Sequence, residues 1–273
     1  MSAQAPPAAP PVLPPVPVRG TIADAWRLMR RYPRLILLPM FAVQVPVAAV
    51  SASVTLVLYF TVFSGEPVKA ASDLINAGPS GPLFAFLAVS AFEGLFAQVA
   101  RGATILGTAA ALRDRPEPLP NLLDPAFTRL GGLLILAIAP LLLFLGLAAT
   151  IVGLVLVPYL VLRLGLVMEA YLLDGVTPAG AFRRSWTVLS GSLWRFFLTL
   201  LLAITALIIP LFVMSSFSLL IAGGRTTQLL ATAAVTLIQG VLVVPMLAFF
   251  TAVTTLFYLR VKERHDARLA ARN

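Results

Sequence analysis

The feature that most constrains this chain is the segment from Leu130 to Leu162, which contains no charged residue. Its apolar character continues to Leu173. A helix at the surface of a soluble protein needs a polar face, whereas a membrane-spanning helix needs about 20 apolar residues in a row. The segment is too long for one crossing, so we predict two helices joined by a tight turn near residues 148–153.

The composition of the whole chain is also that of a membrane protein. Hydrophobic residues make up 59% of the sequence, charged residues only 11%, and the mean hydropathy is +0.96, whereas about 25% of the residues in soluble domains are charged. We predict an all-α membrane protein with six transmembrane helices in three hairpins. The expected spans are residues 35–63, 83–112, 130–149, 153–174, 193–220 and 229–259. This membrane domain, 20–262, is expected to lie between a disordered proline-rich tail, 1–19, and a charged cytoplasmic tail, 263–273.

The chain lacks residue types on which many catalytic sites depend. It has no cysteine, which excludes disulfides, thiolate nucleophiles and cysteine-bound metals. Its single histidine, His265, belongs to the charged tail, so a histidine metal cluster or a Ser-His-Asp triad within the membrane is excluded. Nucleotide-binding and hydrolase motifs are also absent from the sequence. We therefore expect no catalytic residues, no cofactor and no metal.

The basic residues are distributed unevenly between the predicted loops. If the N-terminus is cytoplasmic, the loops on the opposite side contain only Lys69 and Arg225. The other basic residues outside the spans then lie on the cytoplasmic side, which is the positive-inside pattern. It predicts a multi-pass protein of the cytoplasmic membrane with both termini in the cytoplasm. The net charge of +9 is then explained by anionic lipids, and we expect no nucleic acid partner.

Two amphipathic segments precede predicted spans. The first, TIADAWRLMRRY at residues 21–32, has Thr21 as its expected N-cap. The second begins with the N-cap and first-turn pair Thr177 and Pro178. We expect both helices to contact anionic headgroups at the cytoplasmic interface, or to serve simply as anchors of the spans. The candidate lipid contacts are Trp26, Arg27, Arg30, Arg31, Arg183, Arg184, Trp186 and Trp194.

A short sequence pattern recurs before three of the predicted spans. Residues 21–27 and 177–183 share the pattern T-x-A-x-A-aromatic-R, and DPAFTR at residues 124–129 is a fainter copy. Each copy would begin one hairpin. The repeat therefore predicts three hairpins in parallel orientation, each anchored on the cytoplasmic side, rather than an inverted repeat.

Four charged residues fall within predicted spans, where a charge costs at least about 2.5 to 3.5 kcal/mol on insertion scales. They are Glu93, Arg101, Arg163 and Glu169. Counting from the expected ends of the spans places Arg163 near mid-membrane. We predict an ion pair between Glu93 and Arg163, and a second, shallower pair between Arg101 and Glu169. Such charges can hold a helix bundle together, bind an anionic headgroup or solute in a polar cavity, or conduct protons or ions.

The order of these segments resembles a known family. The resemblance is carried by the A-x-A-[WF]-R helix before the first span, by YLVLRLGLVMEAYLLDGVTPAGAFRRSWTVLSGSLWRFF at residues 159–197, and by the closing FYLRVKER. These segments are similar to bacterial integral membrane proteins that include the membrane domain of glycerophosphoryl diester phosphodiesterases. The family implies six spans and a lipid-related setting. We expect no counterpart of the soluble catalytic domain, because only a short tail follows the sixth span, so phosphodiesterase activity does not transfer.

Three classes of function stay open at this stage. A membrane scaffold or accessory protein, associated with lipids or with partner proteins, agrees with the missing catalytic residues. A small-solute or lipid transporter or channel agrees with the charges in spans two and four. An intramembrane lipid enzyme would need a nucleophile or a metal, and the sequence offers neither.

Overall fold

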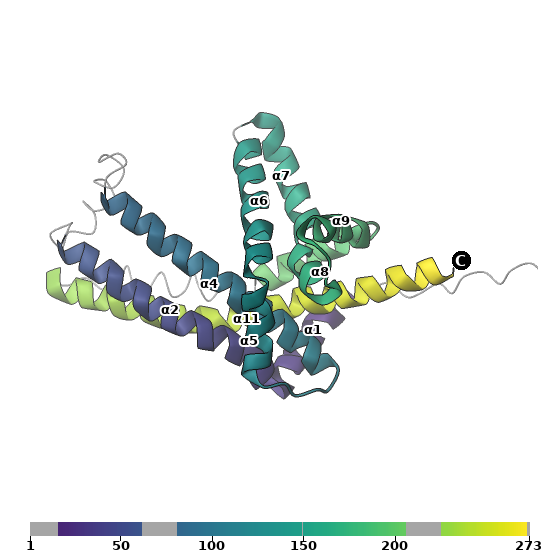
Figure 1. The fold of residues 1–273 in the computed structure, drawn as a ribbon, viewed down its shortest axis with the longest axis horizontal. Coiled ribbons are helices and arrows are strands. Elements are labelled where there is room, and N and C mark those ends of the chain that lie inside the picture. The colour runs from purple at the N-terminus through teal and green to yellow at the C-terminus, as the bar shows by residue number, and fades with distance from the viewer. Residues whose placement is uncertain (1–15, 62–80, 149, 206–224, 272–273) are drawn as a thin grey trace, which may run out of the picture.

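The computed structural model describes residues 16–61, 81–148, 150–205 and 225–271, and every regular element in these ranges is a helix (Figure 1). Five helical segments are long and apolar enough to cross a membrane, and a bent pair of shorter helices would make a sixth. The prediction of an all-α chain with several membrane-spanning helices is therefore confirmed. Most of the proline-rich tail and the connections after the first and fifth predicted spans lie outside the described residues.

Three long helices form one bundle. Helices α2 (Pro33–Thr61) and α4 (Gly81–Leu112) pack along each other, and the first part of α11 (Arg225–Ala270) runs beside them (Figure 1). The contact between α2 and α4 is very close at Gly107, where an added Cβ would lie 2.0 Å from the carbonyl oxygen of Leu35. Small residues allow helix backbones to approach each other in this way within a membrane.

Helices α6 (Leu130–Ala148) and α7 (Ile151–Leu164) form a hairpin that points away from this bundle (Figure 1). The turn between them is tight, because Thr150 caps α7 and its Oγ1 accepts a hydrogen bond from the Gly153 N–H at 2.9 Å. The predicted turn near residues 148–153 is confirmed.

The fourth predicted span, 153–174, is interrupted. Helix α7 ends at Leu164, and α8 (Val167–Asp174) begins after a short break. At this break Gly165 faces the ring of Phe196, and an added Cβ would lie 2.7 Å from that ring. Helix α8 ends at Asp174 and is followed by Gly175, whose φ of +65° is readily adopted by glycine.

Helix α9 (Pro178–Leu189) and the following helix, Leu193–Thr205, meet at an angle of 100°. The predicted cap of α9 is confirmed, since Thr177 Oγ1 accepts a hydrogen bond from the Gly180 N–H at 3.2 Å. Gly191, with a φ of +84°, lies in the bend. The second half of the predicted span 193–220 lies outside the described residues, so the described helices provide five crossings, or six if the bent pair forms one.

The last helix is longer than the sequence predicts. Helix α11 has 46 residues, which at 1.5 Å per residue is about 69 Å, or more than twice the hydrocarbon thickness of a bilayer. The predicted span ended near residue 259, and residues 263–273 were expected to be a solvated tail. The helix instead continues to Ala270, because Arg260, Lys262 and Asp266 hold its last turns against other helices.

Three short helices pack in a similar way. Helix α1 (Val18–Arg31) lies against α11, α5 (Leu119–Thr128) against α4, and α9 against α8. Each of them buries the alanine that precedes the aromatic residue of the sequence repeat, since Ala25, Ala126 and Ala181 are all 0% exposed. The repeated pattern therefore marks a repeated contact, in which a short helix packs against another helix and buries this alanine.

Candidate functional site

A buried charge cluster lies where α4, α8 and α11 meet. We call it the central cluster, and it consists of Arg101, Glu169 and Thr254, one residue from each helix. Glu169 is 0% exposed, and its Oε1 accepts a hydrogen bond of 2.7 Å from the Thr254 hydroxyl. Arg101 Nη2 lies 3.5 Å from the same oxygen. The shallower of the two ion pairs expected from the sequence is thus present, and Thr254 is an addition that the sequence did not indicate.

Two polar atoms of the central cluster have no hydrogen-bond partner in the part of the chain that the structure describes. They are Glu169 Oε2 and Arg101 Nε, and both are buried. An unpaired buried polar atom is costly, and it is unusual in a folded protein. The cluster therefore retains one carboxylate oxygen and one guanidinium N–H that can bind a further polar group.

The predicted pair between Glu93 and Arg163 is wrong. Arg163 donates from Nε to the Tyr159 hydroxyl at 3.0 Å and from Nη1 to the Trp186 carbonyl oxygen at 3.1 Å. Its guanidinium also lies over the rings of Tyr159 and Trp186, 5.3 and 4.9 Å from their centroids. Glu93 is exposed on the part of α4 that precedes the buried contacts.

The physical reason for this error is the break after α7. The predicted depth of Arg163 assumed one straight helix as far as Asp174, but α7 ends one residue after Arg163. Its side chain therefore reaches α9 rather than α4. Ser185 of α9 strengthens this contact by donating a hydrogen bond of 2.8 Å to the Arg163 carbonyl oxygen.

A second charge network joins α8, α9 and α11. We call it the Asp174 network. The Asp174 carboxylate accepts hydrogen bonds from Lys262 Nζ at 2.6 Å, from the Tyr258 hydroxyl at 2.7 Å and from Arg184 Nε at 3.0 Å. Arg184 also pairs with Asp266 at 2.9 Å. Arg184 was predicted as a lipid contact, but its side chain is engaged within the protein.

Helix α1 is tied to α11 by a further set of polar contacts. Asp24 pairs with Arg260, and Thr21 Oγ1 accepts a hydrogen bond of 2.8 Å from Arg260 Nη1. Thr21 does not cap the helix as predicted, because α1 begins at Val18 and the Thr21 hydroxyl donates to the Pro17 carbonyl oxygen at 2.9 Å. A threonine inside the first turns of a helix commonly bonds to the carbonyl four residues earlier.

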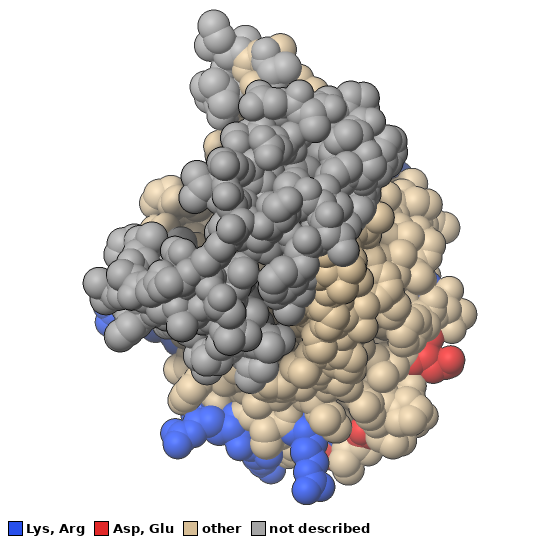
Figure 2. Space-filling view, turned by 90° about the vertical axis from the view of Figure 1, so that its left-hand side faces the viewer, with Lys and Arg blue, Asp and Glu red and all other residues tan. Residues whose placement is uncertain are grey.

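The remaining predicted lipid contacts lie at the surface. The exposed fractions of Trp26, Trp186 and Trp194 are 49%, 41% and 68%. Arg27, Arg30, Arg31 and Arg183 are exposed too, although Arg27 also pairs with Asp24 and Arg31 with Asp114. Figure 2 shows basic side chains projecting from the lower edge of the described surface, below uncharged residues.

The described residues offer interactions rather than an evident reaction centre. Among them no group of three His, Asp or Glu side chains is arranged to hold a metal ion. The central cluster brings together the Glu169 carboxylate, the Arg101 guanidinium and the Thr254 hydroxyl, which suits structural pairing or the binding of a small polar group. No protein-family model, no curated protein and no solved structure matches this chain.

Proposed function

We propose that this protein is a scaffold or accessory protein of the bacterial cytoplasmic membrane, with both termini in the cytoplasm, that binds anionic lipids and partner proteins without catalysing a reaction. The observation that carries the proposal is the mutual engagement of its buried charges. Glu169 is fully buried, and Arg101 and Thr254 bind it from two other helices. Charges that join three helices in this way stabilise the positions of these helices relative to one another, and a scaffold requires such a fixed structure.

The exposed arginines of α1 support the lipid part of the proposal. Arg27, Arg30 and Arg31 are exposed on a helix that also exposes Trp26. Tryptophan is enriched at the level of lipid headgroups, and each basic residue near an anionic leaflet contributes about 1 kcal/mol of attraction. The last turn of α1 therefore suits contact with anionic headgroups.

A comparison of lipid selectivity tests this proposal. The protein is reconstituted in phosphatidylcholine bilayers that contain trace spin-labelled phosphatidylglycerol or phosphatidylcholine, and electron paramagnetic resonance measures the protein-bound fraction of each. We expect a preference for phosphatidylglycerol that falls severalfold when Arg27, Arg30 and Arg31 are all replaced by Gln. The control is Arg268→Gln, which removes an exposed arginine from the last turn of α11. Equal selectivity in the wild type and the triple variant would refute the proposal.

A second candidate function is the transport of a small ion or solute. It is favoured by two atoms of the central cluster that have no hydrogen-bond partner among the described residues, Glu169 Oε2 and Arg101 Nε. Charged side chains buried in a membrane often mark ion or proton pathways. Proton entry into proteoliposomes that contain a pH-sensitive dye tests it. A protein-dependent proton flux that Glu169→Gln abolishes would replace the scaffold proposal with transport.

A further inference from the structure

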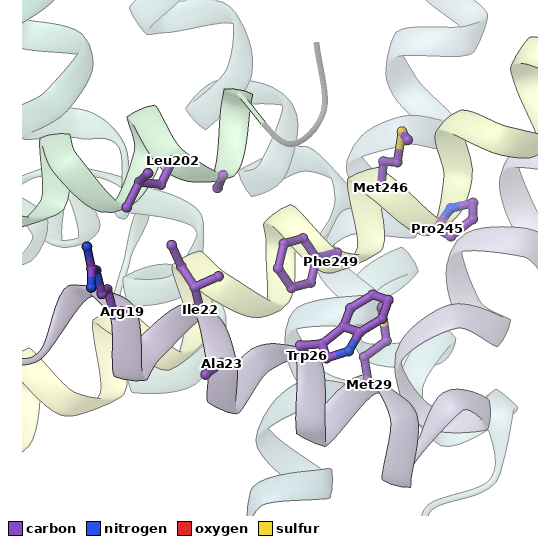
Figure 3. A pocket seen from close by; sticks show the side chains of 10 residues that line it. Arg19, Ile22, Ala23, Trp26, Met29, Leu202, Pro245, Met246 and Phe249 are labelled. Atoms are coloured by element: carbon purple, nitrogen blue, oxygen red, sulfur yellow. The ribbon is translucent and has the colours of Figure 1, made fainter. Parts of the chain in front are cut away.

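An apolar cavity lies between α1, α11 and the helix Leu193–Thr205, and it has a volume of about 900 Å³. Ligand pockets in proteins commonly have volumes of about 300–1,000 Å³. Figure 3 shows side chains of α1 along one side and side chains of α11 and of the helix Leu193–Thr205 opposite them. Its lining includes Ile22, Trp26, Met29, Leu202, Met246 and Phe249.

One charged residue lines this cavity. Arg19 lies at one end of the row of lining side chains, while Pro245 and Met246 lie at the other (Figure 3). Arg19 is exposed, and it forms no hydrogen bond or ion pair with any residue that the structure describes. By contrast, Arg27 and Arg260 share the carboxylate of Asp24. Among the described residues, the cavity therefore combines an apolar lining with one free cation, Arg19, at its edge.

The residues that line the cavity indicate which parts of the membrane surround it, the hydrocarbon interior or the headgroup level. Pro245, Met246 and Phe249 belong to a segment that is long and apolar enough to span the membrane, Val243–Ala270. Trp26, on the opposite side, is half exposed, and its ring meets the edge of Phe249 at a centroid distance of 5.9 Å. A half-exposed tryptophan on an amphipathic helix is typical of the headgroup level. One side of the cavity thus belongs to a membrane span and the other to an interfacial helix.

We propose that this cavity binds one acyl chain of an anionic phospholipid and that Arg19 binds the phosphate of the same lipid. The inference deepens the proposed function, since it names one specific lipid site beyond the general attraction of the exposed arginines of α1. The apolar lining accounts for the chain, and the free guanidinium accounts for the charge, because arginine forms strong paired hydrogen bonds with phosphate oxygens. A soluble anion would use only the guanidinium of Arg19 and would leave the apolar part of the cavity empty.

The three tryptophans of the chain provide the assay. Replacing Trp186 and Trp194 by Phe leaves Trp26, which lines the cavity, as the only tryptophan, and excitation at about 295 nm selects it over the tyrosines. The protein in nonionic detergent micelles is titrated with phosphatidylglycerol or phosphatidylcholine that carries brominated acyl chains, which quench nearby indoles. We expect saturable quenching at low lipid fraction, with an affinity for phosphatidylglycerol about fivefold higher than for phosphatidylcholine.

Two variants test the binding of the acyl chain and the binding of the phosphate separately. Ala23→Phe, at an exposed position that lines the cavity, narrows it and should weaken the saturable quenching by both lipids. Arg19→Ala should remove the fivefold preference and leave the affinity for phosphatidylcholine unchanged. The controls are Ala91→Phe, which adds the same bulk at an exposed position on α4, and Arg268→Ala, which removes an exposed arginine of α11 outside the cavity lining. Both controls should behave as the parent protein.

The outcomes distinguish this inference from the proposed function. Quenching that Ala23→Phe does not change, or a preference that persists in Arg19→Ala, would overturn the lipid site. If that happens while the triple arginine variant still loses its lipid selectivity, the proposed function stands without a specific site. Native mass spectrometry shows whether the protein forms a dimer. If dimer formation relieves the quenching of Trp26 by the brominated lipids, the cavity is assigned to a second copy of the chain, and that result would also overturn the proposal.

Discussion

The central cluster predicts strong coupling between two residues on different helices. We consider Arg101→Met, Glu169→Leu and the double variant. In the single variant Arg101→Met, Glu169 keeps its hydrogen bond from Thr254 but loses its only ion pair among the described residues. In Glu169→Leu, Arg101 loses the same pair but is 32% exposed and can partly turn to solvent. The double variant removes both charges and replaces them with apolar side chains.

The magnitude follows from the geometry. Two unit charges 3.5 Å apart attract each other by about 5 kcal/mol at an effective dielectric constant of about 20. Partial exposure of Arg101 screens this attraction, so we expect Arg101→Met to lower the free energy of unfolding by about 2–3 kcal/mol. Replacing a buried pair by apolar residues is often close to neutral. The double variant should therefore lose less than Arg101→Met alone, with a coupling energy of about 2 kcal/mol.

The assay is equilibrium unfolding in mixed micelles of a mild detergent and dodecyl sulfate, followed by circular dichroism. Arg113→Met, an exposed arginine directly after α4, is the matched control and should change the unfolding free energy by less than about 0.5 kcal/mol. Additive effects of the two single substitutions would refute the ion pair. A double variant that is less stable than either single variant would refute the view that the pair can be replaced by apolar packing.

Three further predictions concern the remaining contacts. Gly107→Ala should destabilise the packing of α2 on α4, because its Cβ would lie 2.0 Å from the Leu35 carbonyl oxygen. The control is Gly94→Ala on the same helix, whose Cβ meets no atom within 4 Å. Equal thermal stabilities of the two variants would contradict this close contact. Asp174→Asn should weaken three hydrogen bonds of the Asp174 network and speed amide hydrogen exchange in α9. Asp124→Asn, an exposed control on α5, should leave the exchange in α9 unchanged. Unchanged exchange in Asp174→Asn would show that the network does not hold α9. Because the chain has no cysteine, a single Arg115→Cys should be labelled by an impermeant maleimide only from the cytoplasmic side and Lys69→Cys only from the opposite side, and the reverse pattern would overturn the predicted orientation.

Much of the fold could be predicted because it depends on local sequence patterns. The long apolar stretches indicate the membrane-spanning helices, and Thr177 followed by Pro178 indicates the start of α9. The pairing of Arg101 with Glu169 could also be predicted, since both residues were expected near the same end of their spans. The common burial of Ala25, Ala126 and Ala181 explains why the same short pattern recurs in three short helices.

Other features depend on contacts between distant parts of the chain. The break at Gly165 accommodates the Phe196 ring, and no proline or polar run at this position indicates it in the sequence. Thr254 and Lys262 lie 85 and 88 residues from the carboxylates that they bind. Hydrophobic periodicity reports which face of a helix is buried, but it does not report which helix covers that face. The partners of Arg163 and the length of α11 were missed for the same reason.

The central claim is that the buried charges stabilise the protein and that the exposed arginines of α1 carry its lipid-binding function. The most direct test is the phosphatidylglycerol selectivity of the Arg101→Met, Glu169→Leu double variant, measured by spin-labelled lipids beside the variant that lacks Arg27, Arg30 and Arg31. We predict that the double variant keeps the selectivity of the wild type and that the triple variant loses it. Loss of selectivity in a folded double variant, together with its retention in the triple variant, would place function at the central cluster and contradict the account.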